Sequence, residues 1–161
     1  MIRELESNDG FLLQELLEKD QAFFMKVYGH DAASEATNLF YSSPNGVGLT
    51  EKCLIGLFEN GGLIGCLDGV YKHPSNRDAY VGFLFVGPDA RCHGRGTSIL
   101  DWFSNECGCR GINNVLTSVS TINKRGLDFF LKQGFNIQTT KFDVKLDLVL
   151  SDLLILRKTL L

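Results

Sequence analysis

The chain has no long uninterrupted apolar segment. Its 161 residues are 44% hydrophobic and 22% charged, as in an ordinary globular protein. No apolar run approaches the roughly 20 residues that a helix needs to cross a bilayer. The first residues, MIRELESNDG, also lack the basic and then apolar order of a secretory signal. We therefore expect a cytoplasmic protein with no membrane partner, and the length favours one domain over residues 1–161.

An excess of positive charge is also absent. The chain has 16 Lys and Arg against 19 Asp and Glu, which gives a formal net charge of −3. Domains that bind nucleic acid usually present a basic face. The balance therefore argues against nucleic acid as a partner, and it is compatible with a cationic or amine substrate.

The sequence lacks the paired spacing of metal or disulfide sites. Its five cysteines are an odd set, and it has three histidines, whereas a structural zinc site takes four ligands in recognisable pairs. Cys53 and Cys66 lie in apolar runs, where a thiol packs as a small hydrophobic group. Cys107 and Cys109 are expected to be structural or incidental. Cys92 lies in a polar loop, and we expect it to be accessible and sensitive to electrophiles.

The most informative stretch runs from Tyr80 to Leu100. An apolar run, Tyr80 to Val86, is followed by the loop Arg91-Cys92-His93-Gly94-Arg95-Gly96, and residues from Thr97 have helical spacing. Glycines let a backbone approach a ligand closely. The first amides of a helix have no internal partners and bind anions. This order of strand, loop and helix predicts a site for a phosphorylated cofactor.

The remaining periodicity predicts an α+β fold. Residues before about 50 have helical spacing, with expected helices from a cap at Asn8 or Asp9, over 21–28 and over 31–41. Three strands follow as an antiparallel meander, over 53–58, 63–71 and 79–86. A strand over 114–119 is reached across the helix that begins at Thr97, which favours parallel pairing with 79–86. Asn123 then caps a helix that stops at Gly134. Two final antiparallel strands begin at 135 and 153 and turn near 148–152.

Two separated motifs resemble the GNAT superfamily of acyl-CoA N-acyltransferases. The first is Arg91-Cys92-His93-Gly94-Arg95-Gly96 after the lead-in Val86-Gly87-Pro88. The second is Asn123, then Phe129-Phe130, then Lys132-Gln133-Gly134-Phe135, at the offset that the family shows. A final apolar segment, Leu154-Ile155-Leu156-Arg157-Lys158, is similar to the family's last strand. The resemblance covers residues from about 53 to the end, and the N-terminal helical part has diverged.

The resemblance implies a GNAT-like mixed, mostly antiparallel sheet with helices on both faces. Its parallel pair, 80–86 and 114–119, is expected to splay and hold acetyl-CoA as the acyl donor. Backbone groups of Leu84, Phe85 and Val86 would bind the pantetheine arm like an added strand. Amides from Cys92, His93, Gly94, Arg95, Gly96 and Thr97 would bind the pyrophosphate. Arg91 and Arg95 would add positive charge, and Asn123 would contact the cofactor from the other side.

The same residues also have plain structural interpretations. Gly94 and Gly96 would suit a tight strand-to-helix turn, and Arg91 or Arg95 would suit a solvated surface. Asn123 would serve as a helix cap. Structural roles are favoured for His93, as a variable loop residue, and for the three aromatic residues, as core (Phe129, Phe130, Phe135).

The resemblance implies transfer of an acetyl group to a primary amine of a small molecule or protein, by direct attack in a ternary complex. Homodimers are common among similar proteins, and the sequence leaves the oligomeric state open. The chain departs from the family at two catalytic positions: Phe130 stands where a tyrosine is frequent, and Tyr80 where a glutamate is frequent. Three proton routes remain: Tyr80 as the catalytic group, Asp68 on the neighbouring strand, or proximity alone.

Two other interpretations follow from these departures. A catalytically silent acyl-CoA-binding module would explain the missing tyrosine. An interaction domain that has lost the cofactor would explain the diverged N-terminal part, but both loop glycines and Asn123 are present.

Overall fold

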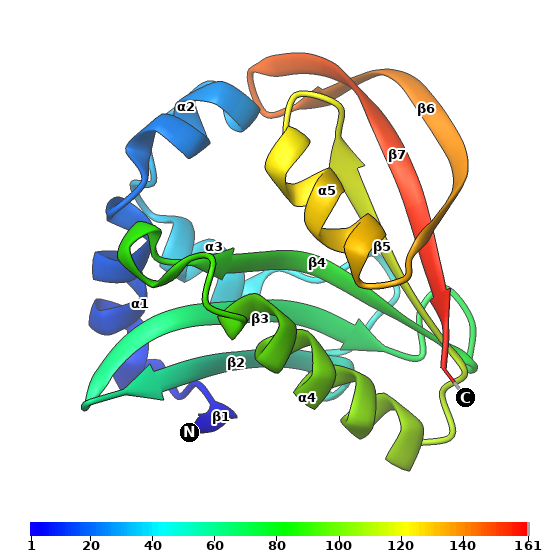
Figure 1. Cartoon of the computed structure of the whole chain (residues 1–161), viewed down its shortest axis with the longest axis horizontal. Coiled ribbons are helices and arrows are strands. Elements are labelled where there is room, and N and C mark those ends of the chain that lie inside the picture. Colours follow the sequence, from blue (N-terminus) through cyan, green and yellow to red (C-terminus); the bar gives the residue numbers. More distant parts are fainter. Residues whose placement is uncertain (161) are drawn as a thin grey trace.

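The computed structural model describes residues 1–160, which form a seven-stranded mixed sheet with helices on both faces (Figure 1). The strands are β1 (Ile2–Glu4), β2 (Lys52–Glu59), β3 (Gly62–Tyr71), β4 (Asp78–Val86), β5 (Asn114–Ser120), β6 (Asn136–Leu146) and β7 (Val149–Thr159), in the order β1-β2-β3-β4-β5-β7-β6. The helices are α1 (Gly10–Glu18), α2 (Gln21–Tyr28), α3 (Glu35–Tyr41), α4 (Arg95–Cys109) and α5 (Lys124–Lys132). The predicted GNAT-like α+β fold is confirmed.

Each face of the sheet carries its own apolar core. On one face, α4 buries Ile99, Leu100 and Phe103 against β2–β5, and Phe130 of α5 joins the same cluster. On the other face, α1–α3 pack over β2, β3 and β4, where Phe24 and Phe85 lie within an aromatic group. The alternation of side chains along each strand supplies both cores from the same sequence. Among residues 1–160, no helix combines the length and the apolarity that a membrane span requires.

The parallel pair β4–β5 separates part of the way along its length. Pairing runs from Asp78–Asn114 to Val81–Thr117 and then ends, although β4 continues to Val86. At the same point β4 has a bulge, because Val81 is opposite Gly69 and Phe83 is opposite Asp68, which leaves Gly82 unmatched. The predicted splay is therefore present, and the edge of β4 that faces β5 is not paired with that strand from residue 82 onward.

Three expectations about local structure are corrected. The N-terminal part is not wholly helical, because residues 2–4 form β1, which pairs with β2. Three residues are too few to show the alternation that predicts a strand. The helix expected over 31–41 begins only at Glu35. The last turn lies at 147–148 rather than at 148–152. Asp147 adopts a positive φ of 50° there, and no glycine in the sequence marks the turn.

This β6–β7 turn is attached to the end of α2. The Leu148 amide donates to the Tyr28 carbonyl over 3.0 Å, and His30 Nε2 lies 2.7 Å from Asp147 Oδ2. The other ring nitrogen of His30 lies 2.6 Å from the Asp31 carbonyl oxygen. Both nitrogens thus face oxygens that only accept hydrogen bonds, an arrangement that favours the doubly protonated and positively charged ring. Two segments more than 100 residues apart in the chain are thereby joined.

Replacing Asp147 with Asn tests this contact. The hydrogen bonds to Asp147 and to the Asp31 carbonyl raise the pKa of His30 above its ordinary 6.5. The stabilisation is therefore complete below about pH 6.5 and is lost as the pH rises through the higher folded-state pKa. We expect urea unfolding to show wild type more stable than Asp147→Asn by about 0.5 kcal/mol at acid pH, and equally stable at a pH well above the folded-state pKa.

The exposed Asp101 on α4 provides the control, because Asp101→Asn makes the same change in charge. A stability difference for Asp147→Asn that persists unchanged at alkaline pH would contradict a charged His30.

Candidate functional site

A cavity of about 640 Å³ occupies the gap between β4 and β5. Its walls are the free end of β4, the loop that follows it, the first turn of α4, residues 117–119 of β5 and the first two turns of α5. Phe23 and Tyr28 of α2 close one side. The cavity therefore combines an apolar strand edge with two helix N-termini, a combination suited to a ligand with a long arm and phosphate groups.

The N-terminus of α4 faces this cavity. Gly94 is the N-cap residue and has a φ of 76°, a left-handed conformation that glycine adopts without strain. The first helical bond runs from the Ser98 amide to the Gly94 carbonyl over 3.0 Å, so the amides of residues 95–97 have no partner within the helix. The helix was expected to begin at Thr97 and begins two residues earlier. Gly96 thus belongs to its first turn.

Space at Gly96 is restricted by α5. A Cβ atom at this position would lie 3.1 Å from Phe129 Cε2 and 3.8 Å from Val86 Cγ2. Gln133 Nε2 also donates to Thr97 Oγ1 over 2.9 Å and ties the end of α5 to the start of α4. The absent side chain therefore keeps the first-turn amides open to the cavity and allows the two helices to approach closely.

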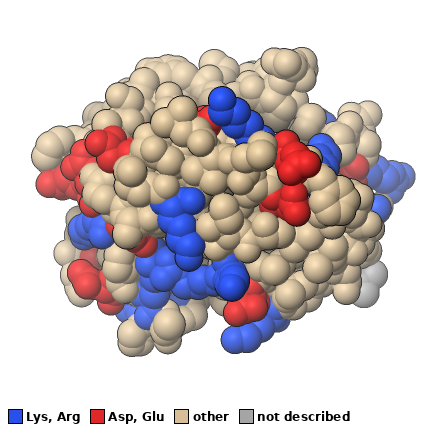
Figure 2. All heavy atoms as spheres, turned by 90° about the horizontal axis from the view of Figure 1, so that it is seen from above, with Lys and Arg blue, Asp and Glu red and all other residues tan. Residues whose placement is uncertain are grey.

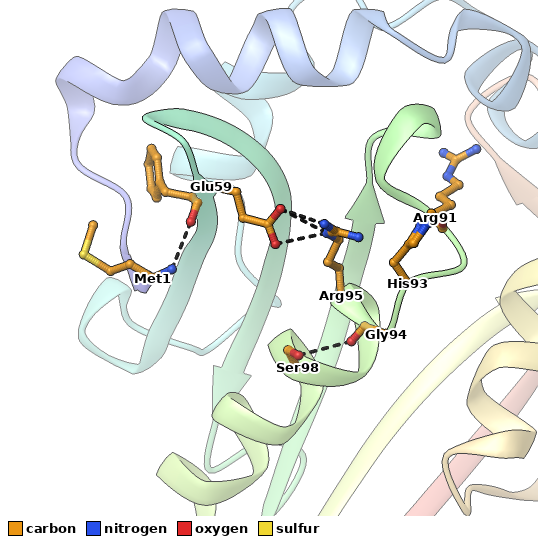
Figure 3. Close-up of polar contacts among 8 residues, drawn as sticks. Met1, Glu59, Arg91, His93, Gly94, Arg95 and Ser98 are labelled. Carbon is orange, nitrogen blue, oxygen red and sulfur yellow. Dashed lines mark hydrogen bonds and ion pairs between the residues drawn. The ribbon is translucent and has the colours of Figure 1, made fainter.

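The two arginines of the loop are already paired with carboxylates. Arg95 Nη2 lies 2.8 Å from Glu59 Oε2 at the end of β2, and Figure 3 shows its side chain directed across to that residue. Arg91 Nη1 lies 2.8 Å from Asp20 Oδ2, while its Nε donates to the Val86 carbonyl. These contacts fix the loop against β2 and the start of α2. The two carboxylates also neutralise much of the positive charge of the arginines that we predicted to bind phosphate.

Arg125, in the first turn of α5, was missed by the sequence interpretation. Its side chain is 63% exposed, lines the cavity, and reaches Asp20 Oδ2 only at 3.6 Å. Figure 2 shows Lys and Arg side chains gathered on the face of the molecule seen from above. The position of Arg125, two residues after the Asn123 cap, could have predicted this role, since a helix N-terminus with a nearby arginine suits phosphate.

The structure brings the predicted cofactor residues together with one exception. Those that line the cavity are Leu84, Phe85, Val86, Arg91, Cys92, Gly94, Arg95, Gly96, Thr97 and Asn123. His93 is exposed and does not line it; its Nδ1 lies 2.6 Å from the Arg91 carbonyl. Asn123 is also a helix cap, because its Oδ1 accepts from the Gly126 amide over 3.0 Å. Contact of these residues with the cofactor remains a prediction.

The candidate catalytic residue Tyr80 lies where β4 and β5 separate. Its hydroxyl is 2.6 Å from Ser118 Oγ on β5. Burial raises the pKa of Tyr80 above its ordinary value, and the hydrogen bond to Ser118 lowers it by less. A raised pKa disfavours the phenolate form that would take a proton from an amine. Phe130 is buried in the core, as expected, and offers no replacement hydroxyl.

A second cavity, of about 300 Å³, adjoins the first on the α1–α3 face of the sheet. Tyr80, Asp68 and Glu35 contribute polar groups to it, and Tyr28, Gly82 and Phe83 line both cavities. Burial raises the pKa of Glu35, and that of Asp68 to about 6. The second cavity therefore holds ionisable groups in a largely apolar lining, and it shares Gly82 of the β4 bulge with the first cavity.

The fold, the glycine loop and the cavity at the splay define an acetyltransferase of the GNAT type. The sequence profile of the acetyltransferase (GNAT) family matches residues 13–135, and the chain belongs to this family. The match begins within α1, so the family pattern extends further toward the N-terminus than the sequence motifs indicated. Acetyl-CoA is accordingly the acyl donor, and the free strand edge, the helix amides and the basic residues of the cavity fit it.

Solved structures share the fold at low sequence identity. The PaiA N-acetyltransferase of Thermoplasma acidophilum in complex with coenzyme A is 20% identical over 99% of this chain and 98% of its own, with a TM-score of 0.75. The ribosomal-protein-S18-alanine N-acetyltransferase of Escherichia coli is 17% identical over 99% of this chain and 92% of its own, with a TM-score of 0.72. An aminoglycoside 6'-N-acetyltransferase complexed with coenzyme A is 16% identical (99% and 96%, TM-score 0.73). Among curated proteins, none matches the chain.

The restricted space at Gly96 predicts the effect of Gly96→Ala on cofactor binding. The added methyl group would press on Phe129 at 3.1 Å and shift it or the first turn of α4. We expect coenzyme A affinity, measured by calorimetry, to fall about tenfold, while the melting temperature is maintained because alanine favours a helix. Gly108 is the matched control on the same helix, since a Cβ there meets nothing within 4 Å. Equal affinities for Gly96→Ala and Gly108→Ala would refute the tight approach.

The pairing of the arginines predicts unequal roles in binding phosphate. Arg125→Gln should weaken coenzyme A binding about tenfold, as expected for a lost charge-assisted hydrogen bond, and should reduce its dependence on salt. Arg95→Gln should have the smaller effect, because Glu59 already neutralises Arg95. Calorimetry at two salt concentrations measures both. A larger loss for Arg95→Gln than for Arg125→Gln would contradict this order.

Proposed function

We propose that the protein transfers the acetyl group of acetyl-CoA to a primary amine of a small molecule or protein, by direct attack in a ternary complex. The observation that carries the proposal is the junction of the two cavities at Gly82 and Phe83. A thioester that follows the free edge of β4 would end at this junction, and an amine in the second cavity would approach it from the opposite side. Both substrates fit at once, so no acyl-enzyme is required.

The second cavity favours an amine as the acceptor. Glu35 attracts a cationic ammonium group, and Asp68, whose other oxygen is paired with Lys52, offers a hydrogen-bond acceptor. Tyr28 and Tyr80 line the same cavity. Two structural neighbours are named for very different acceptors: an alanine of a ribosomal protein, and the 6' position of aminoglycosides. At 17% and 16% identity they share the fold, and they leave both a small molecule and a protein amino group as acceptors here.

A catalytically silent acyl-CoA-binding module is the alternative. It rests on Phe130, which has no proton to give to a leaving thiolate. Phe130 is 7% exposed, and its ring centroid lies 5.1 Å from that of Phe135. The second cavity argues for catalysis, because a module that only holds the cofactor has no need of a cavity with carboxyl groups beside the thioester position.

Release of coenzyme A thiol tests the proposal. Wild-type protein with acetyl-CoA is assayed against spermidine, kanamycin, tyramine and a hexapeptide with an N-terminal alanine. We expect turnover with at least one amine, initial-rate lines that intersect when both substrates are varied, and no acetyl adduct in the intact mass of the protein after incubation with acetyl-CoA alone. Cys92, which is exposed and lines the cofactor cavity, is the residue to inspect for such an adduct.

Two results would count against the proposal. Tight coenzyme A binding with no thiol release for any of the four amines would favour the silent module. Parallel initial-rate lines with an acetylated cysteine would replace direct attack with a two-step transfer.

A further inference from the structure

Lys52 and Asp68 form a buried ion pair on the α1–α3 face of the sheet. Lys52 Nζ donates to Asp68 Oδ1, and the side chains are 6% and 15% exposed. An ion pair this deep gains little net stability, because desolvation of the two charges offsets their attraction. Neither residue lines the cofactor cavity, whereas Asp68 lines the second cavity. The pair therefore requires an explanation other than stability.

The bulge of β4 places Asp68 beside the junction of the two cavities. Asp68 is opposite Phe83, and the unmatched Gly82 directly precedes Phe83 in β4. A Cβ atom at Gly82 would lie 3.6 Å from Asp68 Oδ2. Because glycine has no side chain, this oxygen is open toward the point where an amine and a thioester would meet.

The two oxygens of Asp68 have different surroundings. Oδ1 is held by Lys52, while Oδ2 has no hydrogen-bond partner within residues 1–160. A carboxylate fixed through one oxygen keeps the other in a defined direction. Tyr80 differs in this respect, because its hydroxyl is already bonded to Ser118 Oγ across the splay.

We propose that Asp68 takes the proton from the acceptor ammonium group through Oδ2, and that Lys52 is the positioning residue that holds Asp68 for this step. This inference rests on the proposed amine acetylation. It assigns the proton acceptor to β3, one strand away from the strand on which the sequence motif placed the candidate Tyr80.

The proton balance of the transfer is complete with these groups. Asp68 accepts one proton from the ammonium group, and the neutral nitrogen uses its lone pair to form a bond with the thioester carbonyl carbon. The carbon–sulfur bond then breaks, and its electron pair leaves with sulfur. The second proton of the nitrogen goes to the thiolate, which gives the amide and coenzyme A thiol. Asp68 releases its proton to solvent through the open cavity.

The electrostatic surroundings suit a base that works near neutral pH. Desolvation raises the pKa of Asp68 to about 6, against the lowering effect of Lys52. The carboxyl group is therefore ionised above about pH 6 and protonated below it. Burial also favours the neutral form of an amine in the same cavity. The other titratable groups that face Asp68 or share its cavity are Cys53, Cys66, Tyr28, Glu35 and Tyr80.

The kinetic test compares Asp68→Asn and Lys52→Met with matched controls. The controls are Asp101→Asn on α4 and Lys72→Met, whose exposed side chain is paired with Glu51 at 3.8 Å. The assay uses whichever of spermidine, kanamycin, tyramine and the hexapeptide turns over fastest, with coenzyme A affinity as the check on folding. We expect Asp68→Asn to lower kcat about 10²- to 10⁴-fold and to remove the fall in kcat/KM below about pH 6. Lys52→Met should move that fall to higher pH.

Each outcome of the kinetic test is decisive. Asp68→Asn with wild-type kcat and an unchanged pH profile overturns the assignment while wild-type turnover upholds the proposed function. A loss of kcat in Tyr80→Phe as large as the one expected for Asp68→Asn, together with a wild-type kcat in Asp68→Asn, would transfer the role to Tyr80. A Lys52→Met profile identical to wild type would overturn the positioning role of Lys52.

Carbon-13 NMR of the aspartate carboxyls provides a readout without an acceptor. The signal absent from Asp68→Asn identifies Asp68, and we expect it to titrate near pH 6 in wild type and at higher pH in Lys52→Met. A titration midpoint below pH 5 for the Asp68 carboxyl signal overturns the proposal. This result is obtained even if no amine in the panel turns over, so failure of the proposal and failure of the proposed function can be told apart.

Discussion

The separation of β4 from β5 after Val81 is the constraint on which the rest of the structure depends. Thr117 Oγ1 donates to the Val81 carbonyl over 2.9 Å at the last paired position of the two strands. Beyond it, the bulge at Gly82 turns β4 away, and the backbone edge toward β5 is left for a ligand. Gly82, the unmatched residue of this bulge, also lines the second cavity. One interruption of strand pairing therefore forms the cofactor cavity and places Gly82 between it and the cavity that we propose for the acceptor.

Local sequence signals predicted the parts of the site that lie close together in the chain. The order of strand, glycine loop and helix between residues 80 and 100 requires only that Gly94 adopt a positive φ and that Gly96 leave space, and both hold. Asn123 caps its helix as expected. The order of strand, helix and strand only favoured parallel pairing of β4 with β5. The resemblance to the family predicted that pairing and its splay.

Features made by contacts between distant segments were beyond the sequence. Arg95 looked available for phosphate, but its partner Glu59 lies on a strand 36 residues earlier. Asp68 was one of three proton routes that the sequence left open, but its partner Lys52 was not identified until the register placed both residues on one face beside the bulge. β1 is too short to show a period, and the β6–β7 turn forms without glycine at Asp147. In each case the missing information was the pairing partner.

Amide hydrogen exchange of β4 with and without coenzyme A tests the central claim most directly. If the pantetheine arm binds the free edge of β4 as an added strand, the amides of residues 82–86 that face β5 should exchange more slowly when coenzyme A is bound. The amides of residues 78–81, already paired with β5, should change little and serve as the internal reference. Coenzyme A binding that protects the first turn of α4 but leaves residues 82–86 unchanged would contradict the account.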